Sequence, residues 1–207
     1  MKGARMRLKE EFSHTIIIEK SEFICYLGRA FTEIEAREFI QKIRKEHRDA
    51  THCCTAFVLG ERNEIMRSND DGEPTGTAGS PMLDALCKSG LTNCCACVVR
   101  YFGGIKLGAG GLIRAYSKSV SEAIHLAPKV ETVLMNRYTC TFSYDWVNKL
   151  DFFMKDNCDI LDKTYDVDVT YTFLTKDLNY HDKLIEYSNG QLHPLCIEQS
   201  LIERNCD

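Results

Sequence analysis

The pattern of hydrophobic and polar residues predicts alternating strands and helices in the first 130 residues. Two β-rich runs flank a polar turn within residues 15–27. A helix should follow, because Thr32 and Glu35 form a Thr-x-x-Glu capping box and apolar residues then recur at helical spacing. Further strands are expected at residues 53–59, 64–67 and 94–102.

Glycine and proline interrupt this pattern in two long segments. Residues 69–80, NDDGEPTGTAGS, predict a loop, after which Pro81 suits the first turn of a short helix that ends at about Lys88. A second glycine-rich loop follows the last of these strands and leads into a long helix predicted to begin at about Leu112. The inner face of this helix is expected to carry Ile113, Tyr116, Val120, Ile124 and Ala127.

The remaining residues predict a separate domain. Between 131 and 202 the order is strand, helix, strand, strand, helix, strand, with Ser143 and Asp177 as helix caps. This βαββαβ order matches the ferredoxin-like motif. With a boundary at Pro128-Lys129, the sequence predicts an α+β protein with domains at residues 1–129 and 130–207.

Composition indicates the compartment in which the chain works. The first twelve residues are charged and lack an apolar core, so we expect no secretory signal, and no apolar run approaches the ~20 residues of a membrane span. The chain has 11 cysteines, several of them within apolar runs. Such cysteines behave as small hydrophobic residues. We therefore expect reduced thiols, a cytoplasmic location and no membrane partner.

Charge is distributed unevenly along the chain. The formal net charge is −4. Residues 1–130 hold 19 basic and 16 acidic residues, a net charge of +3, whereas residues 131–207 hold 7 and 14, a net charge of −7. An anionic partner such as RNA should therefore prefer the first half. The chain as a whole lacks the strongly basic composition of a dedicated nucleic-acid binder.

The glycine-rich loop is the candidate anion site. Glycines expose backbone N–H groups at a helix N-terminus, and basic residues flank them; the candidates are Arg100, Lys106, Gly108, Gly110, Gly111 and Arg114. A helix terminus contributes only about 0.3–1 kcal/mol, whereas millimolar binding requires about 4 kcal/mol, so the cations would have to converge on one anion. The alternative is a tight turn that lets strand and helix pack closely.

The acidic loop has two interpretations. Asp70, Asp71 and Glu73 could hold a hard cation or supply a base. Alternatively, Asp70 and Asp71 bond loop N–H groups and pair with Arg67 or Arg100. The second interpretation is the simpler one, and the sequence predicts no metal, no cofactor and no catalytic residue.

Histidine and cysteine motifs favour structural roles. His52 and Cys53 are adjacent on a predicted strand and should point to opposite faces, which is unsuitable for a nucleophile and its base. Cys94 and Cys97 have a zinc-pair spacing, but they lie within a β run and no second pair with such spacing exists. Both pairs are therefore predicted to belong to the core.

Two uninterrupted motifs in these loops resemble the YigZ/IMPACT family. They run from Arg67 to Met82 (RSNDDGEPTGTAGSPM) and from Val99 to Tyr116 (VRYFGGIKLGAGGLIRAY), and the resemblance covers about residues 15–127. Membership implies an N-terminal domain of the ribosomal protein S-five domain 2-like fold and a ferredoxin-like C-terminal domain. It also implies a translation-linked regulatory role. Cys53 stands where the family usually has Asn, which puts any polar site at that position in doubt.

Three functional hypotheses follow. The first is a translation-linked binding protein that contacts RNA or the ribosome through its N-terminal domain. The second is a small-anion or nucleotide-binding protein, or a hydrolase, that uses the acidic and glycine-rich loops. The third is a regulator that binds translation-related proteins without a ligand. The first two require the two loops to meet on one accessible surface.

Overall fold

The structure is a computed structural model that describes residues 5–206. The chain separates into two compact units: the first extends to Glu131 and includes Asn205 and Cys206, and the second comprises Thr132–Arg204. Each unit contains a sheet with helices, which confirms the predicted α+β class. No helix between residues 5 and 206 is long and apolar enough to cross a membrane.

The first unit is built on a five-stranded antiparallel sheet. Its strand order is β2-β3-β6-β4-β5, so that β6, late in the sequence, lies in the centre. These strands are mostly buried, apart from the edges. Their bounds are Phe12–Ile18 (β2), Ser21–Arg29 (β3), His52–Leu59 (β4), Ile65–Asn69 (β5) and Cys94–Tyr101 (β6), and a short strand, Arg5–Leu8 (β1), precedes them.

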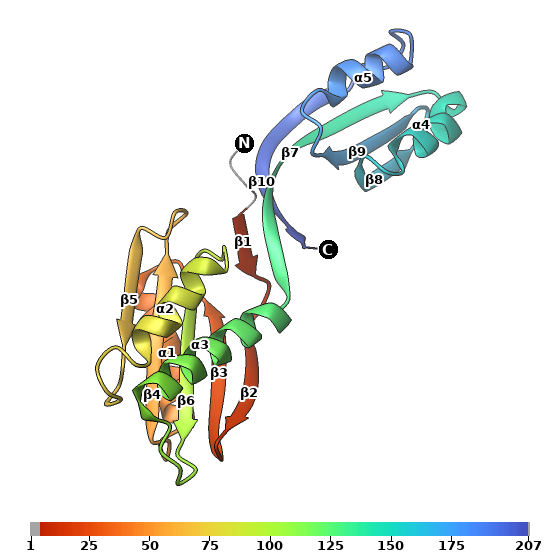
Figure 1. Ribbon diagram of the computed structural model, residues 1–207. Helices are drawn as coiled ribbons and strands as arrows, with labels where there is room; N and C mark the ends of the chain where they lie inside the picture. Colours follow the sequence, from red (N-terminus) through yellow and green to blue (C-terminus); the bar gives the residue numbers. More distant parts are fainter. Residues whose placement is uncertain (1–4, 207) are drawn as a thin grey trace. The chain divides into compact units, whose positions relative to one another are not determined.

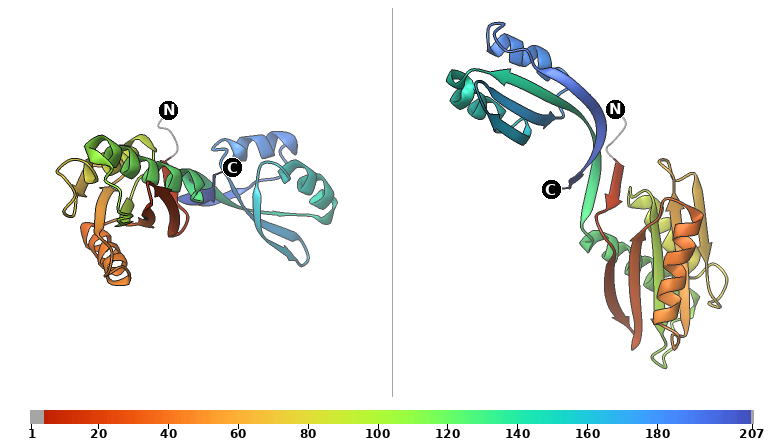
Figure 2. Two further views of the ribbon diagram at one scale, coloured as in Figure 1. Left: turned by 60° about the horizontal axis from the view of Figure 1, so that its bottom comes forward. Right: turned by 180° about the vertical axis from the view of Figure 1, so that it is seen from behind.

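Helices cover both faces of this sheet. Figure 1 shows α2 (Gly79–Lys88) and α3 (Gly108–Leu126) in front of the strands, and Figure 2 shows α1 (Glu33–Glu46) on the opposite face. The capping box of α1 is present, since Thr32 Oγ1 accepts a hydrogen bond from the Glu35 backbone N–H at 3.2 Å. The two faces therefore have separate cores.

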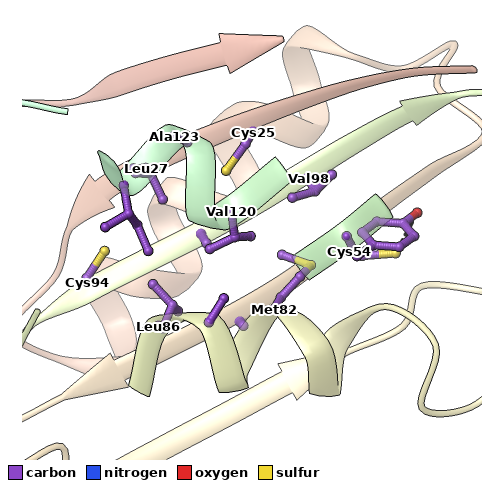
Figure 3. Close-up of a cluster of buried hydrophobic side chains, with 14 of the residues drawn as sticks. Cys25, Leu27, Cys54, Met82, Leu86, Cys94, Val98, Val120 and Ala123 are labelled. Atoms are coloured by element: carbon purple, nitrogen blue, oxygen red, sulfur yellow. Dashed lines mark hydrogen bonds between the residues drawn. The ribbon is translucent and has the colours of Figure 1, made fainter. Parts of the chain in front are cut away.

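Cysteine contributes strongly to these cores. Figure 3 shows Cys25, Cys54 and Cys94 among Leu, Met and Val side chains between the sheet and the helices α2 and α3. Burial raises the pKa of the Cys25 and Cys94 thiols far above the ordinary value. The ten cysteines from Cys25 to Cys196 are free thiols, and Cys94 and Cys97 are fully buried. They serve as small hydrophobic residues, as predicted.

Helix α3 differs from the prediction in its start and at one position of its inner face. It begins at Gly108, four residues before Leu112, so three of the expected loop glycines lie in its first turn. Glycine disfavours helix by about 1 kcal/mol per residue, but the packing of the 19-residue helix on the sheet outweighs that cost. Tyr116, Val120, Ile124 and Ala127 are buried as predicted, whereas Ile113 is 43% exposed. The inner face also carries Leu112, Ala115, Ser119 and Ala123.

The second unit has the expected βαββαβ order. Its sheet order is β10-β7-β9-β8, in which the fourth strand lies beside the first, as in ferredoxin-like domains. The elements are β7 (Lys129–Phe142), a short 3-10 helix (Tyr144–Trp146), α4 (Val147–Met154), β8 (Asp159–Tyr165), β9 (Val169–Thr175), α5 (Tyr180–Tyr187) and β10 (Leu195–Asn205).

The core of the second unit lies on one face of this sheet. Tyr138 and Phe142 of β7 and Tyr171 of β9 pack with Leu150 of α4 and Leu184 of α5. Neighbouring residues of β9 point away from this core, because successive side chains of a strand lie on opposite faces of the sheet.

The predicted helix caps of this unit are both different in detail. Ser143 precedes the 3-10 helix but makes no capping hydrogen bond with its side chain. Asp177 lies two residues before the N-cap of α5, and its Oδ1 accepts the N–H of Asn179, the N-cap residue, at 3.0 Å. Asp177 therefore stabilises the turn that leads into the helix.

Helix α4 provides a matched test of the second core. Leu150 is fully buried, whereas Phe152, two residues later, is 83% exposed. We expect Leu150→Ala to lower the free energy of unfolding by about 2–5 kcal/mol, because it removes buried methyl groups and leaves a cavity. Phe152→Ala should change it by less than about 0.5 kcal/mol. Urea unfolding followed by circular dichroism measures both, and equal effects would contradict this core assignment.

Candidate functional site

The acidic and glycine-rich segments meet at one accessible pocket in the first unit. The pocket has a volume of about 380 Å³. Glu73 and Pro74 of the acidic loop line it together with residues from the end of β6 to the first turns of α3. The complete lining comprises Thr51, His52, Glu73, Pro74, Arg100, Phe102, Lys106, Leu107, Gly108, Ala109 and Leu112.

A buried ion pair forms the wall of this pocket. Arg100 Nη1 lies 2.6 Å from Glu73 Oε1, and the two residues are only 5% and 7% exposed. Arg100 comes from the central strand β6, which places its guanidinium between the rings of Phe23 and Phe102, 5.3 and 5.5 Å from their centroids. Cation–π contacts of this kind are strengthened when the cation is desolvated.

Further polar groups hold the pair in place. The Tyr116 hydroxyl of α3 donates to Glu73 Oε1 at 2.8 Å. Burial, with Cys54 and Glu73 nearby, raises the pKa of Tyr116 far above its ordinary value, so this hydroxyl keeps its proton. Arg100 Nη2 lies 3.5 Å from Ser21 Oγ, whereas Arg100 Nε has no hydrogen-bond partner among the described residues.

His52 is a pocket residue that the sequence interpretation missed. Its Nδ1 lies 2.8 Å from the carbonyl oxygen of Asp71, which can only accept, so Nδ1 carries a proton. Its Nε2 lies 3.9 Å from Glu73 Oε2. His52 pairs across the strands with Arg100, a register that no sequence pattern reveals.

Cys53 does not share this environment. It faces the α1 side of the sheet, as expected from its position next to His52. Hydrogen bonding with Cys97 and burial raise the pKa of the Cys53 thiol far above its ordinary value. A thiol of this kind is a poor nucleophile.

The two aspartates of the acidic loop have structural partners. Asp70 accepts the N–H groups of Gly76, Ala78 and Gly79 at 2.8–3.0 Å, at the start of α2. Asp71 pairs with Arg44 at 2.8 Å and accepts the Cys53 N–H at 2.8 Å.

These contacts confirm that the two aspartates accept hydrogen bonds from backbone N–H groups, but the ion pairs differ from those predicted. Glu73, and neither aspartate, pairs with Arg100, while Arg67 lies 3.7 Å from Glu33. No group of three or more metal-ligating side chains gathers anywhere in the described part of the chain.

The glycines of the glycine-rich segment have two different functions. A Cβ on Gly103 would lie 2.0 Å from the backbone of Lys20, so this glycine permits close packing of two chain segments. Gly108 has φ +67°, and a Cβ there would meet nothing within 4 Å. Gly108 and Gly110 are exposed in the first turn of α3, which has neither an acidic residue nor a side-chain cap. The backbone N–H groups of this turn are therefore available to a ligand.

Two exposed cations flank this helix start. Lys106 lines the pocket, and the guanidinium of Arg114 extends back toward Gly110, where a Cβ would lie 3.6 Å from Nη1. Neither cation has an ion-pair partner among residues 5–206. Because Glu73 neutralises Arg100, these two cations and the helix amides carry the positive potential of the site.

Comparison with known proteins identifies the family. Residues 19–124 match the family described as the Impact N-terminal domain. The chain is 49% identical over 177 residues to IMPACT family member YvyE of Bacillus subtilis (strain 168), covering 86% of this chain and 75% of that protein. The chain belongs to the IMPACT family.

Further similarity extends over both units. IMPACT family member YigZ of Escherichia coli (strain K12) is 35% identical over 189 residues, which cover 88% of this chain and 92% of that protein. A crystal structure of a protein described as hypothetical has 32% identity and a TM-score of 0.60, covering 96% of this chain and 99% of that one. The resemblance stated from the two loop motifs is therefore confirmed, and the solved structure shares the fold of this IMPACT protein.

The capping role of Asp70 has a pH-dependent consequence. Partial burial opposes ionisation, but the N–H groups of Gly76, Gly79 and Ala78 outweigh it and hold the pKa of Asp70 below its ordinary value of 3.8. A lowered pKa stabilises the fold above that ordinary value, and this stabilisation is lost as the pH falls through the lower, folded-state pKa.

We therefore expect Asp70→Asn to lower the free energy of unfolding by about 1 kcal/mol at pH 7 and to weaken its dependence on pH below about 4. Urea unfolding between pH 2.5 and 7 measures both effects. Asp84→Asn, at an exposed position of α2, is the control and should leave stability within about 0.5 kcal/mol. An Asp70 variant with the acid sensitivity of the wild type would contradict the assigned role.

Proposed function

We propose that this IMPACT protein is a cytoplasmic, translation-linked regulatory protein whose first unit binds phosphate groups of RNA or the ribosome at the pocket beside α3. One observation carries the proposal: Lys106 and the uncapped amides of Gly108 and Ala109 line the same pocket as an exposed aromatic ring, Phe102. Cations and helix N-termini suit phosphate, while aromatic rings suit unstacked bases.

The electrostatics support an exposed, salt-sensitive site. The buried Arg100–Glu73 pair is neutral as a unit, so a phosphate meets Lys106 and the helix amides first. The helix terminus alone supplies about 0.3–1 kcal/mol, which is below the roughly 4 kcal/mol needed for millimolar affinity. Binding must therefore use several contacts, as an extended polyanion provides.

Co-sedimentation with ribosomes, and binding to single-stranded RNA, at salt concentrations from 50 to 300 mM test this function. Wild-type binding should weaken with salt, and Lys106→Gln should lower the log–log slope by about 0.7, the contribution of one phosphate contact on a single strand. Lys45→Gln, an equal charge change at an exposed position of α1 on the other face of the sheet, is the matched control. Binding that does not respond to salt or to Lys106→Gln would refute the proposal.

A second candidate is a free nucleotide or another small anion. The observation that favours it is the size of the pocket, because about 380 Å³ lies in the range of small-ligand sites, roughly 300–1,000 Å³. Here His52 and Glu73 are the groups within reach of a ligand that could exchange protons with it.

Thermal unfolding with a panel of nucleotides, with and without Mg²⁺, separates this candidate from the first. A ligand at about 100 times its dissociation constant should stabilise the protein by about 2.7 kcal/mol, and Lys106→Gln should reduce the gain. If no nucleotide stabilises the protein while RNA binding depends on salt, the small-anion candidate is rejected and RNA remains as the ligand.

A further inference from the structure

The outer side of α3 carries an acid-free stripe of basic and hydroxyl side chains. Arg114, Ser117, Ser121 and His125 follow at spacings of three and four residues, which places them on one helix face; we call them the α3 stripe. Arg114, Ser121 and His125 are exposed, and Ser117 is half-buried. The stripe lies opposite the residues that α3 buries against the sheet.

A second groove lies at the C-terminal end of this stripe. Its volume is about 370 Å³, and its polar lining consists of Lys88, Ser89, Ser117, Ser121, His125 and Lys129 without a carboxylate. Helix C-termini carry partial negative charge, which disfavours anions. Here Lys129 Nζ donates to the carbonyl oxygens of His125 and Ala127, so the negative end of α3 is already neutralised.

The other end of the stripe joins the pocket described above. The Arg114 guanidinium lies over Gly110, within one turn of the exposed amides of Gly108 and Ala109. The acid nearest in sequence, Glu122, is on the flank that faces β2, where it contacts Lys118 at 3.6 Å and His14 at 3.3 Å. The α3 stripe therefore joins the two grooves without a carboxylate of its own.

We infer that single-stranded RNA binds along the α3 stripe, with its phosphodiester backbone running from Lys106 to Lys88. The inference rests on the proposed function and extends its site from one pocket to a track. From Gly108 to His125 the helix rises about 25 Å, at 1.5 Å per residue. At about 3.4 Å per stacked nucleotide, this length holds about seven nucleotides.

The chemistry of the track favours a nucleic-acid strand over other polyanions. Arg114 belongs to one end of the track, and Lys88 lines the groove at the other end together with Ser117 and Ser121, whose hydroxyls donate to phosphate oxygens. Phe102, which is 47% exposed, stands at one end of the track, where a terminal base can stack on it.

Binding of a 12-nucleotide oligouridylate to the full chain, measured between 50 and 300 mM salt, tests the track. The double variant K88Q/R114Q should lower the log–log salt slope by about 1.4, which corresponds to two phosphate contacts. R37Q/K45Q removes the same charge from α1, on the other face of the sheet, and should leave the slope unchanged. If the double variant does not fold, the single variant R114Q decides, with an expected change of about 0.7.

Each alternative result has a definite meaning. If K88Q/R114Q keeps the salt slope of the wild type while Lys106→Gln binds RNA more weakly, the track is overturned. The pocket beside α3 then remains as the phosphate site. Equal affinity for a 12-base-pair RNA duplex would overturn the choice of a single strand. A wild-type protein that co-sediments with ribosomes but binds no RNA oligonucleotide at any salt concentration would overturn the track alone. A protein that binds neither would overturn the proposed function as well.

Discussion

The buried ion pair between Arg100 and Glu73 is the interaction on which the site of this IMPACT protein depends. It joins the central strand β6 to the acidic loop, and Tyr116 connects it to α3. A buried charge that loses its partner typically costs about 3–5 kcal/mol, so each member constrains the other. The loop that carries Glu73 must therefore close over the sheet, and this closure places it beside the glycine-rich segment.

The pair also determines which charges a ligand can reach. Because Arg100 and Glu73 neutralise one another inside the protein, the exposed potential comes from Lys106, Arg114 and the amides at the start of α3. Asp70 and Asp71 are likewise occupied, by backbone N–H groups and by Arg44, so they shape the loop. The buried ion pair of the pocket is therefore neutral, and the exposed cations beside it are positively charged.

The second unit has the opposite character. Its core lies on one face of a ferredoxin-like sheet and is rich in aromatic side chains, among them Tyr138, Tyr171 and Phe173. Residues 131–207 have a net charge of −7, which makes phosphate contact there unfavourable. The chain therefore confines its candidate polyanion site to the first unit, while the second unit has the surface charge that a basic protein partner would meet.

Sequence alone determined the α+β class, the order of most elements and the family, because periodicity, capping boxes and glycine motifs are local in the chain. It also indicated both loops as candidate sites. Only tertiary structure decided that His52 belongs to the pocket, that Asp71 pairs with Arg44, and that α3 begins at Gly108. These features depend on strand register, on side chains distant in sequence and on packing that outweighs glycine's helix propensity, and none of them leaves a local pattern.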